Sequence, residues 1–88
     1  MLYTAPNQTY TKKYLAELKD KYGIIYDGKG CFAFKVIPRK MNNPLVQILA
    51  EDDGNLFETD IKFDIYWIKD FINNLQAAQT YADKINFW

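Results

Sequence analysis

The 88-residue sequence predicts a single α+β domain spanning residues 1–88. Two patterns support this prediction. Apolar residues recur at helical spacing near both ends of the chain, and the centre consists of short apolar runs separated by glycine-containing turns. Two amphipathic helices and a sheet with one apolar face bury their apolar sides most economically in two layers. We therefore expect a three- to four-stranded antiparallel meander with an N-terminal and a C-terminal helix packed on one face.

The first helix is predicted to follow Thr11, whose hydroxyl can accept a hydrogen bond from the first helical turn. Gly23 is typical of the left-handed residue that ends a helix. Between these positions the apolar residues fall on one side of the predicted helix, at Tyr14, Leu15, Leu18 and Tyr22.

Two hairpins are predicted in the centre of the chain. The first turns at residues 27–30, where the sequence DGKG lies between apolar runs. The second turns at Asp53-Gly54, a pair that suits a type I′ turn. The register set by this turn places Ala50, Ile48 and Val46 opposite Phe57, Thr59 and Ile61 on an apolar face. On the other face it pairs Glu51 with Leu56, Leu49 with Glu58, Gln47 with Asp60 and Leu45 with Lys62.

The second helix is predicted to begin at Asp64, which can act as its N-cap and favours the positive end of the helix dipole. Its apolar residues form one stripe: Ile65, Ile68, Phe71, Ile72, Leu75, Ala78 and Ala82.

The composition excludes most catalytic chemistry. The chain has no histidine and no serine, and Cys31 is its single cysteine. These absences exclude Ser-His-Asp and Cys-His catalysis, imidazole acid–base chemistry and an internal disulfide. We therefore expect a non-enzymatic protein that holds no cofactor and no metal.

Carboxylate-based alternatives are weaker. In an EF-hand alignment with Gly54 at position six, Glu51 and Asp53 supply oxygens, but Leu49 occupies the first ligand position. The spacing Asp60-Ile61-Lys62 is that of a metal-dependent nuclease, and it also fits a solvated strand with alternating charge. A carboxylate pair for glycoside hydrolysis would need a substrate-sized cleft, which a domain of this size rarely forms.

The charges are divided unevenly along the chain. Residues 1–50 carry eight basic and three acidic side chains, and residues 51–88 carry three basic and eight acidic ones. The acids that are expected to gather around the aromatic pair Tyr66 and Trp67 are Glu51, Asp52, Asp53, Glu58, Asp60 and Asp64. Aromatic anchors within a charged rim are typical of a protein interface. We therefore predict that this surface binds another protein with a basic surface.

Two alternatives belong to other classes. Lysines interleaved with tyrosines on the first helix could bind nucleic acid, through Lys12, Lys13, Lys19 and Lys21. The single arginine disfavours readout of base edges. A self-associating structural protein is the other alternative, in which the apolar C-terminal residues 85–88 dock on a neighbouring chain.

In its size, its composition rich in lysine, asparagine and isoleucine, and its lack of catalytic residues, the chain resembles the small accessory proteins of bacteriophages and mobile elements. These include anti-CRISPR and other anti-defence inhibitors. The resemblance implies an inhibitor that blocks a basic nucleic-acid-binding surface of a host nuclease or CRISPR effector, and it assigns no site residues. The sequence shows neither a signal-peptide pattern nor a long apolar run, which predicts a cytoplasmic protein that does not bind membranes.

Overall fold

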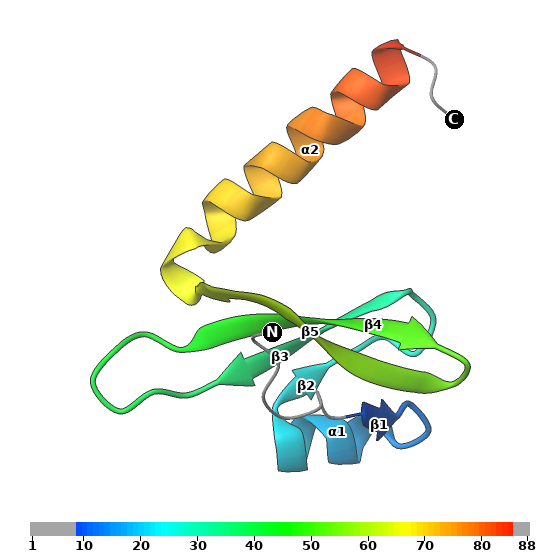
Figure 1. Ribbon diagram of the computed structural model, residues 1–88, viewed down its shortest axis with the longest axis vertical. Coiled ribbons are helices and arrows are strands. Elements are labelled where there is room, and N and C mark those ends of the chain that lie inside the picture. Colours follow the sequence, from blue (N-terminus) through cyan, green and yellow to red (C-terminus); the bar gives the residue numbers. More distant parts are fainter. Residues whose placement is uncertain (1–8, 86–88) are drawn as a thin grey trace, which may run out of the picture.

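The computed structural model describes residues 9–85. The elements in chain order are β1 (Thr9–Thr11), α1 (Leu15–Tyr22), β2 (Ile24–Ile25), β3 (Phe32–Ile37), β4 (Leu45–Asp52), β5 (Asn55–Asp64), the 3₁₀ helix η1 (Ile65–Trp67) and α2 (Ile68–Lys84). The strands form one antiparallel sheet in the order β1-β5-β4-β3-β2. Figure 1 shows α1 on one side of this sheet and α2 extending from the other side.

The α+β class and the antiparallel meander of β2 to β5 are confirmed, but the sheet has five strands rather than three or four. The additional strand is β1, in which Thr11 pairs with Asn55 at the edge of β5. The predicted capping role of Thr11 is therefore wrong, and α1 begins at Leu15 without a side-chain cap. Thr11 has an extended backbone because it pairs with β5 and is not part of the helix.

The core lies between α1 and one face of the sheet, which we call the α1 face. Ala33, Leu49 and Leu56 are fully buried on this face beneath Leu18, and Tyr10 and Ile24 complete the cluster. The alternation of strand side chains places these residues together, because Ala33 pairs with Leu49 and Leu49 pairs with Glu58 across three adjacent strands.

The prediction that both helices pack on one face is wrong. Phe63 pairs with Val46 on the opposite face, which we call the outer face, and its ring stacks on Phe71 of α2 with centroids 4.9 Å apart. This contact directs α2 to the outer side of the sheet. The face that was predicted to be covered, with Val46, Ile48 and Phe57, is therefore the face that α1 leaves uncovered.

The second hairpin is confirmed near its turn. Asp53 and Gly54 have φ values of 53° and 83°, as a type I′ turn requires, and Ala50 pairs with Phe57. Beyond Leu49 the predicted register is wrong, because Gln47 pairs with Lys62 rather than with Asp60.

The register shifts because hydrogen bonds at Thr59 replace the strand ladder there. The Thr59 hydroxyl donates to the carbonyl oxygen of Ile48 at 2.7 Å, and the Thr59 carbonyl accepts from Gln47 Nε2 at 2.8 Å. The irregularity adds two residues to β5, so side chains beyond it keep their faces.

Gly23 ends α1 as predicted, with a φ of 72°. A Cβ at this position would lie 2.9 Å from the carbonyl oxygen of Val36, whereas a Cβ at Gly54 would meet nothing within 4 Å. Both Gly23→Ala and Gly54→Ala should lower the free energy of unfolding by about 1–2 kcal/mol, because both positions are left-handed. Gly23→Ala should lower the free energy of unfolding more, because the new Cβ must also move the end of α1 away from Val36 of β3. Urea unfolding of both variants measures the difference, and equal losses would contradict the close approach.

The position of the core can be tested with a pair of leucine and isoleucine variants. Leu49 is fully buried on the α1 face, and Ile61 on the outer face is 54% exposed. Leu49→Ala should therefore lower the free energy of unfolding by about 2–5 kcal/mol. Ile61→Ala should lower it by less than about 1 kcal/mol, because little packing is lost at an exposed position. A larger loss for Ile61→Ala than for Leu49→Ala, measured by urea unfolding, would mean that the core lies on the outer face.

Candidate protein-binding surface

An open apolar groove lies between the outer face of the sheet and α2. It consists of two adjoining hollows of about 390 and 200 Å³, which share Phe34, Phe71 and Leu75. Every side chain that lines them is apolar. The sheet contributes Ile25, Phe32, Phe34, Val36, Val46, Ile48 and Ile61, and η1 and α2 contribute Ile65, Ile68, Phe71, Ile72 and Leu75.

The two walls follow from two sequence periods. Residues at every second position of β3 point to the outer face, which brings Phe32, Phe34 and Val36 into line. Residues of α2 at helical spacing turn Phe71 and Leu75 toward them. Both patterns were recognised in the sequence as helix stripe and strand face, and both were assigned to the core. Whether these two sets of side chains form a closed core or an open groove depends on the position of α2, which neither pattern specifies.

The rims of the groove are exposed although they are apolar. Phe32 is 62% exposed and Leu75 is 55% exposed, while Val46 and Ile48 at the floor are buried. None of the seventeen residues of α2, all of which lie in the described part, is buried. Large contiguous apolar patches are rare on monomeric proteins, and they mark sites of interaction.

The acidic residues that were predicted to bind a partner are spread along the second hairpin, with Glu58 and Asp60 in the middle of β5. Asp52 and Asp53 lie at the turn, and Asp64 lies at the far end of β5. Ten strand residues separate these ends by about 30 Å, at about 3.4 Å per residue. The structure therefore does not bring the predicted acids together as one cluster around the aromatic pair.

Three of these acids form ion pairs within the chain. Glu51 accepts from Lys12 at 2.9 Å and Asp64 accepts from Arg39 Nη2 at 2.9 Å. Glu58 accepts from Lys35 at 3.0 Å and lies on the α1 face, which was predicted to be left uncovered by the helices. Asp52, Asp53 and Asp60 are exposed. These pairs reduce the negative potential that the sequence predicted for this region.

Tyr66 and Trp67 lie in η1, next to the groove. They are 71% and 56% exposed and contact each other edge to face, with ring centroids 5.1 Å apart. Asp64 precedes them and accepts from the backbone N–H of Tyr66 at 2.8 Å, so it caps η1. The prediction made Asp64 the cap of the long helix, which instead begins at Ile68 without a side-chain cap. The hydrogen bond from Tyr66, with the nearby guanidinium of Arg39, holds the pKa of Asp64 below its usual value.

The lysines of the nucleic-acid alternative are not arranged as one patch. Lys12 precedes α1 and pairs with Glu51. Lys13 and Lys21 lie over the rings of Tyr14 and Tyr22, at 5.7 and 5.5 Å from the ring centroids. Lys19 is exposed on α1. Each of these two contacts joins a lysine to the tyrosine that follows it in the sequence.

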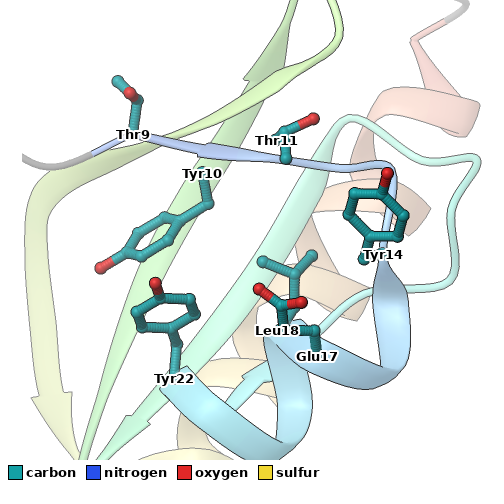
Figure 2. A pocket seen from close by; sticks show the side chains of 7 residues that line it. All are labelled: Thr9, Tyr10, Thr11, Tyr14, Glu17, Leu18 and Tyr22. Carbon is teal, nitrogen blue, oxygen red and sulfur yellow. The ribbon is translucent and has the colours of Figure 1, made fainter.

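A smaller hollow lies between β1 and α1. Figure 2 shows the rings of Tyr10 and Tyr22 next to one another, with Leu18 and Glu17 farther along the hollow. Their ring centroids are 4.9 Å apart. The hollow measures about 150 Å³, below the roughly 300–1,000 Å³ of ordinary ligand pockets. It is therefore a packing gap at the end of the core.

Tyr10, Lys35 and Glu58 form a partly buried polar network beside this hollow. Tyr10 Oη donates to Glu58 at 2.6 Å, and Lys35 Nζ donates to Tyr10 Oη at 2.9 Å. Burial, followed by the bond to Glu58, raises the pKa of Tyr10. Burial opposes the charge of Lys35, but its bonds to Tyr10 and Glu58 keep its pKa above the usual value.

No protein family, no curated protein and no solved structure matches the chain. Within residues 9–85, no group of three or more Cys, Asp or Glu side chains is placed to hold a metal ion. No helix in the same range is long and apolar enough to cross a membrane. Of residues 85–88, which were predicted to dock on a neighbouring chain, 86–88 lie outside the described residues.

The polar network predicts a loss of stability at alkaline pH. Tyr10 and Lys35 have pKa values above their usual 10.0 and 10.5. Their stabilising contribution is therefore complete below about pH 10 and is lost as pH rises through the folded-state values, because the unfolded chain releases its protons first. The free energy of unfolding should fall between about pH 10 and about pH 12, and it should fall less in Tyr10→Phe. Urea unfolding across this range tests it.

Tyr66→Phe is the matched control for this experiment, because Tyr66 is exposed and lies outside the network. It should retain the full dependence of stability on pH. An unchanged dependence in Tyr10→Phe would mean that the network does not contribute.

Proposed function

We propose that this chain is a protein-binding module that acts by binding and not by catalysis, and that its binding surface is the apolar groove. The observation that supports the proposal is the pair of adjoining hollows whose lining is wholly apolar and whose rims, at Phe32, Ile61 and Leu75, are more than half exposed. Water contact with such a surface is unfavourable, and binding of an apolar partner removes it.

A protein is a better occupant than a small molecule. Sites for small ligands place a few polar groups among apolar walls to orient the ligand. The two hollows expose no polar lining atoms, and the groove follows the length of the first turns of α2. An amphipathic helix laid into an apolar groove satisfies this geometry, because it buries a stripe of side chains and satisfies its own backbone hydrogen bonds.

Tyr66 and Trp67 extend the surface at one end. Their polar ring atoms and large apolar area suit the border between a buried centre and a polar rim. The predicted preference for a basic partner rests on the exposed acids Asp52, Asp53 and Asp60. It stays a prediction, as does the anti-defence role that the resemblance implies.

Photo-crosslinking in living cells tests the proposed function. Leu75→p-benzoylphenylalanine places the reactive group in the groove, and Thr80→p-benzoylphenylalanine places it on the polar side of the same helix. A protein-binding groove should give adducts of discrete mass from the first variant and none from the second. Equal labelling of both positions, or none from position 75, would contradict the proposal.

A further inference from the structure

We propose that the occupant of the groove is α2 of a second copy of this chain. This inference rests on the proposed function and names its partner. In the dimer, the two copies are related by a two-fold axis, and the apolar stripe of each α2 helix covers the groove of the other chain.

The chain carries both halves of such an interface. Each copy offers one open groove and one amphipathic helix, and the stripe of that helix includes Ile68, Phe71 and Leu75. The stripe continues through Ala78 and Ala82 beyond the part of α2 that lines the groove. Small residues there let a second helix approach closely. A two-fold interface uses the same patch on both copies, so one dimer covers the groove and the stripe of both copies.

The exposed area is sufficient for a stable dimer. The apolar side chains on the groove rims are between 37% and 62% exposed; they are Ile25, Phe32, Phe34, Val36, Ile61, Ile72 and Leu75. Their exposed area together is on the order of 700 Å², close to the roughly 800 Å² that each partner buries in an interface of standard size.

The charge of the chain does not oppose the association of two copies. The formal net charge of the chain is +0, so two copies do not repel each other as whole molecules.

Sedimentation equilibrium of the full chain tests the proposal. From micromolar to hundreds of micromolar, the wild type should approach twice the chain mass of 10.4 kDa. Leu75→Asp should weaken association by about tenfold or more, since each dimer then buries two carboxylates. Thr80→Asp adds the same charge on the polar side of α2 and should leave association unchanged. Circular dichroism confirms that each variant keeps its helices.

The outcomes separate this inference from the proposed function. A wild type that remains monomeric throughout the concentration range overturns the second copy as occupant. If position 75 then still gives crosslinked adducts of a mass other than twice the chain, the groove binds a different protein and the proposed function stands. If position 75 gives no adduct, both fail.

Discussion

The burial of Leu49 and Leu56 under α1 is the contact on which the rest of the structure depends. A five-stranded sheet has two faces, and the single short helix α1 packs on one of them. Because the strands alternate, choosing this face for the core fixes Phe32, Phe34 and Val36 on the other face. The direction of α2 and the existence of the groove both follow from that choice.

Acids on the covered face are compatible with burial because each has a cationic partner. Glu58 accepts from Tyr10 and Lys35, and Glu51 accepts from Lys12. These partners come from distant parts of the chain, so the positive first half and the negative second half neutralise each other within one molecule. The remaining surface is distinguished by its apolar groove more than by its charge.

Local features of the fold could be predicted from the sequence, because neighbouring residues determine them. The Asp53-Gly54 turn, the stop at Gly23 and the cap at Asp64 are of this kind. The side of the sheet that each helix covers could not be predicted, since it depends on pairs such as Phe63 with Phe71 and Lys35 with Glu58. For the candidate site, the sequence predicted the apolar stripe of α2 and an apolar face of the sheet. It did not predict that the two would lie apart and form an open groove. Glu58 was predicted to lie on the uncovered face of the sheet. Its ion pair with Lys35, which is distant in the sequence, permits its burial.

The edge strand β1 has a consequence for the order of folding. Thr9 pairs with Phe57 across forty-eight positions, whereas the strands of the second hairpin are joined by a two-residue turn. Closing the long loop costs more chain entropy, and only three residues of β1 offset that cost. The hairpin therefore forms early, and β1 is added to a sheet that already exists. Since Tyr10 enters the core with β1, the polar network of Lys35 and Glu58 is completed only at that last step, and fluctuations of the edge expose it first.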